Sequence, residues 1–195
     1  MLAADLIEQA ERHGFDAWQL WGGAHQATVG AVAALGAEEL NPTAVSNHIA
    51  TMTTLVDVLR KAGLNAYITF FDSVLARLLI TAGQPNQART RLDTALQLAR
   101  DTGMHFYDAE LLRLRAHTHT DPDTRQTDIG AALDLARRQG AILFELRAAL
   151  DDFELRGDPA RAAVVDAVSH FPANSTFPEL ARARDAPGSF DPQPT

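Results

Sequence analysis

The spacing of apolar residues predicts two amphipathic helices near the middle of the chain. Between residues 64 and 82, apolar side chains recur at i, i+4, i+7, i+8 and i+11, which is the spacing of one helical face. These side chains are Phe71, Leu75, Leu78, Leu79 and Ala82. Residues 85–102 repeat the spacing with smaller side chains, at Ala88, Leu92, Ala95, Leu96 and Ala99. Because small side chains allow close helix–helix approach, the two segments are predicted to form one helical hairpin.

The same pattern returns with a period of about 37 residues. Pro85, Pro122 and Pro159 stand 37 residues apart. Residues 92–103 realign with residues 129–140, and six of the twelve positions are identical. A period between about 20 and 50 residues is typical of solenoids, in which each hairpin buries its apolar face only against its neighbours. The sequence therefore predicts an all-α solenoid of antiparallel helix hairpins.

Four glycines, each followed four residues later by an aromatic residue, support this prediction. The pairs are Gly14–Trp18, Gly63–Tyr67, Gly103–Tyr107 and Gly140–Phe144. Because glycine tolerates the left-handed conformation that ends many helices, each glycine is predicted to end the second (B) helix of a hairpin. Each aromatic residue then begins the first (A) helix of the next hairpin. We expect these aromatics to form interhelical core rather than a ladder that stacks on a ligand.

These signals divide the chain into an array, a cap and a tail. The array is predicted over residues 1–171 and begins halfway through a hairpin, because residues 2–13 form a B helix without an A helix before it. A capping helix is predicted within residues 172–185, from Pro178 to about Arg184. The Pro-rich residues 186–195 are expected to be disordered. Helices within the array are predicted at residues 2–13, 16–35, 42–62, 64–82, 85–102, 105–118, 122–139, 141–156 and 159–170.

The helix pairs, the small residues of the B helices and the prolines at their starts are similar to tetratricopeptide-type repeats. Residues 10–18, 103–115 and 135–149 further resemble the C-terminal solenoid of large bacterial signalling ATPases. Many of those proteins carry an adenylate/guanylate cyclase domain, and relatives carry a LuxR-type DNA-binding domain. The resemblance covers about residues 4–185, and its most specific part is Phe-Tyr-Asp-Ala-Glu-Leu-Leu-Arg-Leu-Arg at residues 106–115.

This sequence departs from that family outside the solenoid. It contains no Gly-x4-Gly-Lys-Ser/Thr loop for nucleotide phosphates, and neither a cyclase domain nor a helix-turn-helix accompanies the solenoid. The resemblance therefore implies only the role of the solenoid, which is a sensing or interaction arm.

Composition narrows the classes of partner. The net charge of −8 argues against non-specific binding to nucleic acid and against docking on anionic membranes. The absence of cysteine excludes disulfides and thiolate metal sites. The start of the chain lacks the pattern of a signal peptide, and the most apolar window, residues 66–82, is interrupted by Asp72 and Arg77. A cytoplasmic protein is expected.

Two clusters of polar residues are candidate sites of chemistry. His117 and His119 form the one close histidine pair, but residues two apart on a helix point to different sides, so a solvated turn is favoured over a metal site. Asp151 and Asp152 diverge for a similar reason, and a solvated acidic turn is favoured over paired catalytic carboxylates. We therefore expect no catalytic residue, no cofactor and no metal, and a protein that is not an enzyme.

The A helices carry the predicted partner-binding residues. In tetratricopeptide arrays the A helices line a concave groove, and charged residues there can bind an extended peptide or a partner helix. The candidates are Asp108, Glu110, Arg113, Arg115, Glu145 and Arg147. The alternative is an ordinary solvated helix face with neighbouring charges.

Two functional hypotheses follow. The first is a non-enzymatic protein–protein interaction module, linked to bacterial ATPase, cyclase or transcription-regulator signalling. The alternative is a detached C-terminal fragment of a larger ATPase or cyclase protein, with no independent activity. Under that alternative, the apolar face of residues 2–10 would be exposed and would promote self-association.

Overall fold

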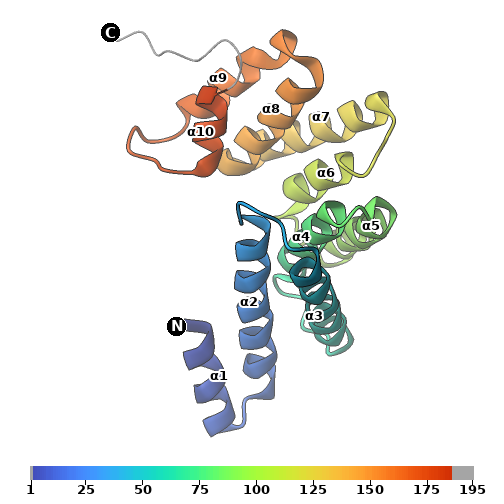
Figure 1. Cartoon of the computed structure of the whole chain (residues 1–195), viewed down its shortest axis with the longest axis vertical. Coiled ribbons are helices and arrows are strands. Elements are labelled where there is room, and N and C mark those ends of the chain that lie inside the picture. The colour runs from blue at the N-terminus through green and yellow to red at the C-terminus, as the bar shows by residue number, and fades with distance from the viewer. Residues whose placement is uncertain (1, 186–195) are drawn as a thin grey trace. The chain divides into compact units, whose positions relative to one another are not determined.

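A computed structural model describes residues 2–185, and these residues form helices and connecting turns without any strand (Figure 1). The all-α prediction is confirmed, while the predicted disordered tail, residues 186–195, lies outside the described residues. The helices are α1 (Leu2–His13), α2 (Asp16–Leu35), α3 (Pro42–Lys61), α4 (Ile68–Thr81), α5 (Pro85–Thr102), α6 (Asp108–Ala116), α7 (Pro122–Gln139), α8 (Ile142–Arg156), α9 (Arg161–Ser169) and α10 (Pro178–Asp185), with a short 3-10 helix, η1 (Asp158–Ala160), before α9.

Proline, asparagine, aspartate and glycine set the helix ends. Pro42, Pro85 and Pro122 each begin a helix, where the missing N–H of proline costs no intrahelical hydrogen bond. Before α7, the Asp121 carboxylate accepts a hydrogen bond from the backbone N–H of Thr124 at 2.9 Å. Gly103 ends α5 in the left-handed region, with φ of 72°. These local signals explain why the predicted B helices match the observed ones closely.

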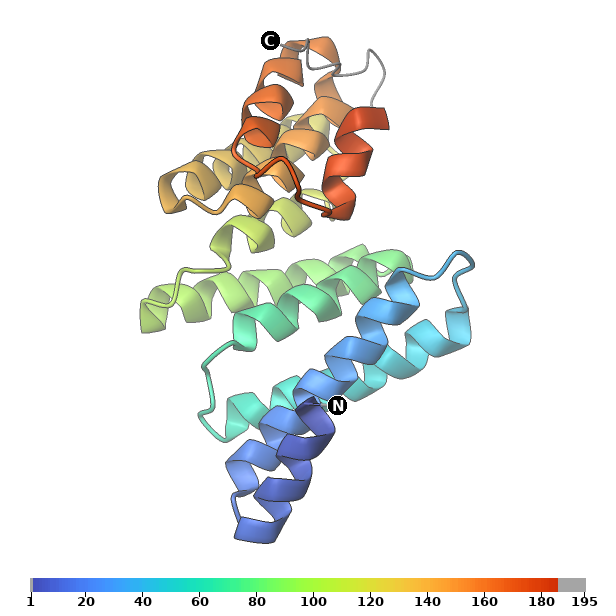
Figure 2. The ribbon, with the colours of Figure 1, turned by 90° about the vertical axis from the view of Figure 1, so that its left-hand side faces the viewer.

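The chain divides into two compact units, Met1–Tyr107 and Asp108–Thr195, which we call the N-terminal and C-terminal units. In the N-terminal unit each helix packs against the next, and α2 also packs against α4. Figure 1 shows α2 between α1 and α3, and Figure 2 shows α4 and α5 running side by side. The largest fully buried side chains of this unit are Met52, Val56, Leu59, Ile68, Phe71, Leu75, Leu78 and Leu92.

The C-terminal unit has the same order of contacts. Helices α6, α7, α8 and α9 pack in sequence, α6 also packs against α8, and α10 packs against α8 and α9. One buried cluster unites the last helices, and it includes Leu133, Leu146, Leu150, Val164 and Leu180. Sequential hairpins in which successive A helices also touch are consistent with an α-solenoid.

Two A helices begin later than predicted. Helix α4 begins at Ile68 rather than at residue 64, and α6 begins at Asp108 rather than at residue 105. Before α4 the chain forms a turn closed by the hydrogen bond from Ile68 N to Asn65 O. Tyr67 in this turn has φ of 58° and is the one residue other than glycine with positive φ in the described part of the chain. Apolar periodicity does not distinguish such a turn from a first helical turn.

Candidate functional site

The six predicted partner-binding residues all lie in the C-terminal unit, on α6 and α8. The structure places most of them in ion pairs with one another or with neighbouring helices. Glu110 accepts two hydrogen bonds from Arg113, at 2.8 and 2.9 Å. The side chains of Glu110, Arg113 and Asp151 are all buried. Arg113 Nη1 donates to Asp151 Oδ2 on α8 at 2.7 Å. Buried charges therefore join the two A helices.

Further ion pairs continue from α8 to α10. Arg147 Nη1 lies 3.4 Å from Glu110 Oε1, and its Nε donates to Glu179 Oε1 on α10 at 2.7 Å. Arg182 on α10 donates to Glu154 on α8 at 2.6 Å. Arg147 follows Glu110 by 37 residues, so one predicted repeat period separates two charges that form a pair. Alternating charges thus connect α6, α8 and α10.

The remaining candidates connect α6 and α8 to the B helices. Arg115 holds the carboxylate of Asp128 on α7 with two hydrogen bonds, at 2.8 and 2.6 Å. Glu145 accepts from Arg137 on α7 at 2.9 Å. Asp108 is buried in the first turn of α6. The alternative of a solvated helix face is therefore wrong for the buried members of the set, while their role in partner binding stays a prediction.

The acidic pair at the end of α8 corrects a prediction. Asp151 and Asp152 were expected in a solvated turn, but both are buried. As expected for adjacent helical residues, they point to different partners. Asp151 pairs with Arg113 on α6, whereas Asp152 accepts from Gln126 on α7 at 3.0 Å and pairs with Arg156. Arg113 precedes Asp151 by 38 residues, so no spacing within one helix could have predicted this pair.

The network keeps its central charges ionised. Burial alone would lower the pKa of Arg113, but the charges and hydrogen bonds of Glu110 and Asp151 outweigh it and raise that pKa above its ordinary value. Burial would raise the pKa of Asp151, yet the hydrogen bond with His117 and the charge of Arg113 hold it below its usual range. A partner that binds Arg113 or Asp151 would therefore have to displace the charged groups that already contact these side chains within the protein.

The histidine pair also takes part in the network. His117 Nε2 lies 2.6 Å from Asp151 Oδ2, and His119 Nε2 lies 3.2 Å from Asp128 Oδ2. Both histidines lie in the turn region after α6, as expected, but they are partly buried rather than fully solvated. Within residues 2–185, no group of three histidine or acidic side chains is arranged to hold a metal ion. Three buried carboxylates, those of Asp151, Asp128 and Glu145, are each shared between an arginine and a histidine.

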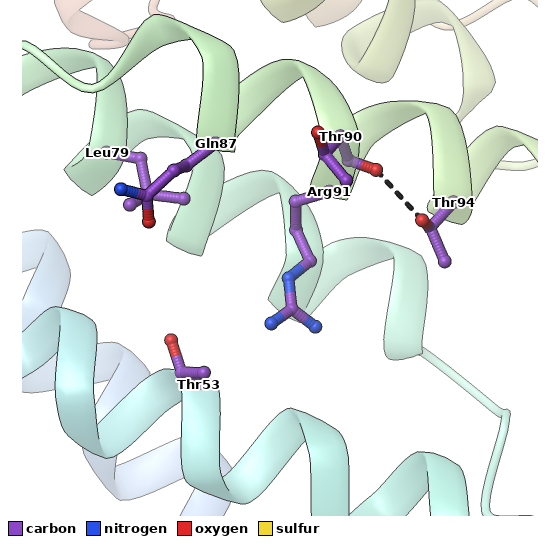
Figure 3. Close-up of a pocket in the computed structure, with 6 residues that line it drawn as sticks. All are labelled: Thr53, Leu79, Gln87, Thr90, Arg91 and Thr94. Atoms are coloured by element: carbon purple, nitrogen blue, oxygen red, sulfur yellow. Dashed lines mark hydrogen bonds between the residues drawn. The ribbon is translucent and has the colours of Figure 1, made fainter.

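A polar groove lies in the N-terminal unit, between α3 and α5. Figure 3 shows Arg91 of α5 and Thr53 of α3 pointing into the space between these helices. The cavity there has a volume of about 310 Å³, and a second one of about 540 Å³ shares Thr90 and Thr94 with it and reaches Arg60 and Asp101. Most of the residues that line the two cavities carry hydroxyl, amide or charged groups, and Leu79 and Leu98 are the apolar ones.

A buried ion pair lies beside this groove. Asp72 of α4 is fully buried and accepts a hydrogen bond from Arg60 at 2.5 Å, while Arg91 Nη1 lies 4.0 Å from its other oxygen. Burial raises the pKa of Asp72 to about 6, and the two arginine charges offset this effect only in part. The sequence showed Asp72 only as an interruption of an apolar window.

Two of the four aromatic residues that were predicted to form interhelical core are exposed instead. Trp18 and Tyr67 are 56% and 57% exposed, so the prediction is wrong for these two, while Tyr107 and Phe144 are half-buried. Trp21 of α2 packs between helices instead, with its ring 5.8 Å from that of Phe71 on α4. The aromatic contacts continue outward to exposed rings. Tyr67 meets Trp21 edge-to-face at 6.0 Å and Phe106 at 5.9 Å.

The comparisons with known proteins returned no relative. No protein-family model matches the chain, and no curated protein and no solved structure matches it either. Among residues 2–185, no helix combines the length and apolar character that crossing a membrane requires. Function is therefore inferred from the chain's own surfaces, on which the exposed aromatic residues of the N-terminal unit are the main candidates.

Proposed function

We propose that the chain is a tetratricopeptide-like solenoid that acts as a non-enzymatic protein-interaction module. The observation that supports this proposal is the exposure of Trp18 on α2, and of Tyr67 and Phe106 in the turns before α4 and α6, where the rings of Tyr67 and Phe106 lie 5.9 Å apart. Tryptophan and tyrosine are the residue types that contribute most to binding energy in protein interfaces. We call these three residues the aromatic face. Its partner is a protein that presents apolar side chains.

The sequence resemblance to the solenoids of bacterial signalling ATPases supports a context for this binding. The proposed partner is then an ATPase, cyclase or transcription regulator of the same cytoplasm. Because the charges on α6 and α8 are paired within the protein, we place the principal contact with the partner on the aromatic face. Of the six charged candidates, Arg115 and Arg147 keep about a quarter of their side chains exposed and can contribute at the edge of such an interface.

Affinity capture with matched variants tests the proposal. The tagged protein, a Trp18→Ala variant and a Val165→Ala control would each be used to capture proteins from a lysate of the native cell. Val165 is also exposed but lies on α9, in the other unit. We expect one partner to be recovered reproducibly by the wild type and the control and lost with Trp18→Ala. Equal recovery by all three proteins would exclude the aromatic face as the binding surface.

A further inference from the structure

The polar groove of the N-terminal unit separates two helices that do not pack directly against each other, α3 and α5. One ion pair crosses the groove, in which Arg91 Nη1 of α5 donates to Asp57 Oδ1 of α3 at 2.7 Å. The cavity beside Thr53 has a volume of about 310 Å³, which is within the range of sites for small molecules. The polar groups of this cavity therefore indicate which kind of molecule fits it.

Arg91 points into this cavity and keeps one edge of its guanidinium without a partner (Figure 3). Its Nη1 contacts Asp57 and lies 4.0 Å from Asp72 Oδ1, whereas its Nε and Nη2 contact no acceptor within residues 2–185. The same edge holds a carboxylate at Arg115, whose Nε and Nη2 donate to the two oxygens of Asp128. Because this edge presents two parallel N–H groups, it matches two oxygens of one oxyanion.

Other side chains of the cavity also have unused hydrogen-bonding groups. Thr53 of α3 and Gln87 of α5 make no side-chain hydrogen bond within the described residues. The hydroxyls of Thr90 and Thr94 donate to carbonyl oxygens of their own helix, at 3.1 and 2.8 Å, and keep their lone pairs. The cavity thus combines donors for an anion with acceptors for hydroxyl groups of the same molecule.

We propose that this cavity binds a small molecule through a phosphate, sulfate or carboxylate group, which contacts the free edge of Arg91 and the side chains of Thr53 and Gln87. The neighbouring cavity of the groove suits an anion less well, because Asp93 and Asp101 line it. The inference goes beyond the proposed interaction module and does not rest on it, since the cavity shares no residue with the aromatic face.

The charges around Arg91 make this binding depend on a proton. Asp57 and Asp72 balance Arg60 and Arg91 when both carboxylates are ionised. An anion at Arg91 then adds a third negative charge to two positive ones, and a proton on Asp72 removes this excess. Asp72 is fully buried, and its Oδ1 has no hydrogen-bond partner within residues 2–185. Asp72 is therefore the carboxylate whose charge is lost at the lowest cost.

Few other ionisable groups surround Asp72, whose pKa burial raises to about 6. The charged groups that act on it from α3 and α5 are Arg60, Asp57 and Arg91. On α4 itself the other charged residue is Arg77. Helix α2, which also packs against α4, has Asp16 and His25 as titratable residues, and the His25 ring lies 5.2 Å from that of Phe71. Because a bound anion adds negative charge beside Asp72, it should raise the pKa of Asp72 further.

A titration of the full chain with sulfate tests the site, followed by nuclear magnetic resonance. Sulfate would replace chloride up to about 50 mM at constant ionic strength, and we expect the Nε–H signal of Arg91 to shift and to saturate in the millimolar range. The backbone amide signals of Thr53 and Gln87 should shift with it, stop responding in Arg91→Met, and respond normally in the control Arg100→Met. The absence of a saturable shift, or an unchanged response in Arg91→Met, would overturn the proposal.

Thr53→Val gives a second test that keeps Arg91 and nearly keeps the shape of the replaced side chain, in case Arg91→Met does not fold. This variant should bind sulfate about two- to tenfold more weakly, which is the loss expected for one hydrogen bond. Its circular dichroism spectrum should match that of the wild type. Undiminished affinity in a folded Thr53→Val protein contradicts the proposed set of contacts.

The pH dependence of sulfate binding tests the role of Asp72. Sulfate keeps its charge between about pH 5.5 and 7.5, so a change in its affinity over this range arises in the protein. We expect the wild type to bind sulfate about fivefold more tightly at the lower pH, because the bound anion raises a pKa that lies near 6. Asp72→Asn carries no charge at this position and should bind equally at both pH values. Equal binding by the wild type at both pH values, or a pH dependence that persists in Asp72→Asn, would show that Asp72 does not take up the proton.

Discussion

Arg113 lies at the centre of the buried charges of the C-terminal unit, and its removal tests how far they depend on it. In Arg113→Met, Glu110 and Asp151 stay buried and lose their main counter-charge, leaving Arg147 and His117 as the nearest partners. Breaking a buried ion pair in this way costs about 3–5 kcal/mol. We expect a loss of that size in the free energy of unfolding, measured by urea denaturation.

The matched control is Arg100→Met on α5. The guanidinium of Arg100 is exposed and donates hydrogen bonds to Gln97 on the same helix. Exposed charge contacts contribute about 0–1 kcal/mol, so this variant should unfold almost as the wild type does. Equal losses in the two variants would mean that solvent reaches the network around Arg113. The same energetics make a charge reversal at Arg113 a poor test of partner binding, because it would unfold the unit.

Asp72 gives a second prediction, on pH. Its pKa is about 6 in the folded protein and about 3.9 in an unfolded chain, so the folded state binds a proton more tightly. Its contribution to stability is therefore fully present below about pH 4 and is lost as pH rises through 6. That contribution is about 3 kcal/mol at most, from about 1.4 kcal/mol per pKa unit.

Comparison of wild type with Asp72→Asn isolates this group, because Asp151 and Glu179 have lowered pKa values and change stability in the opposite direction. We expect the stability difference between the two proteins, measured by urea unfolding, to move in favour of Asp72→Asn as pH rises from 4 to 7. A difference that is constant over this range would show that Asp72 keeps an ordinary pKa.

At the scale of helices, local signals in the sequence predicted most of the boundaries. Proline, glycine and capping side chains act on their own backbone, so the ends of α5 and α7 are visible in sequence. The starts of α4 and α6 were placed three or four residues too early, because apolar periodicity does not separate a turn, such as the one at Tyr67, from a first helical turn.

The apolar register of α5 can be tested at Leu96, which is buried as its spacing predicts. Leu96→Ala removes buried methyl groups and leaves a cavity, so it should lower the free energy of unfolding by about 2–5 kcal/mol. Leu40→Ala is the control, because Leu40 lies in the loop before α3 with half of its side chain exposed. Its loss should stay below about 0.5 kcal/mol. A loss below about 1 kcal/mol at Leu96 would indicate that the helix packs with another face.

At the scale of the whole molecule, the sequence predicted the class of fold and missed the character of its surfaces. Period and helix pairing follow from short-range patterns. The burial of Asp151 and the exposure of Trp18 depend instead on which helix covers which face, and no pattern within one helix determines that. The charged residues of α6 and α8 were predicted to form an open surface. Their ion-pair partners, such as Glu179 for Arg147, lie one hairpin further along the chain, so a pattern within one helix does not show them.

The division into two units leads to a prediction about cooperativity. Each unit has its own buried side chains, and the ion pairs described around Arg113 lie wholly within the C-terminal unit. In solenoids stability depends on nearest neighbours, so local damage opens the hairpins that surround it first. In Arg113→Met, amide hydrogen exchange in α6–α8 should accelerate by at least tenfold, while the protected amides of α3 and α4 should exchange at wild-type rates. Equal acceleration in both units would mean that the chain unfolds as a single cooperative body, and that its two compact units share one stability.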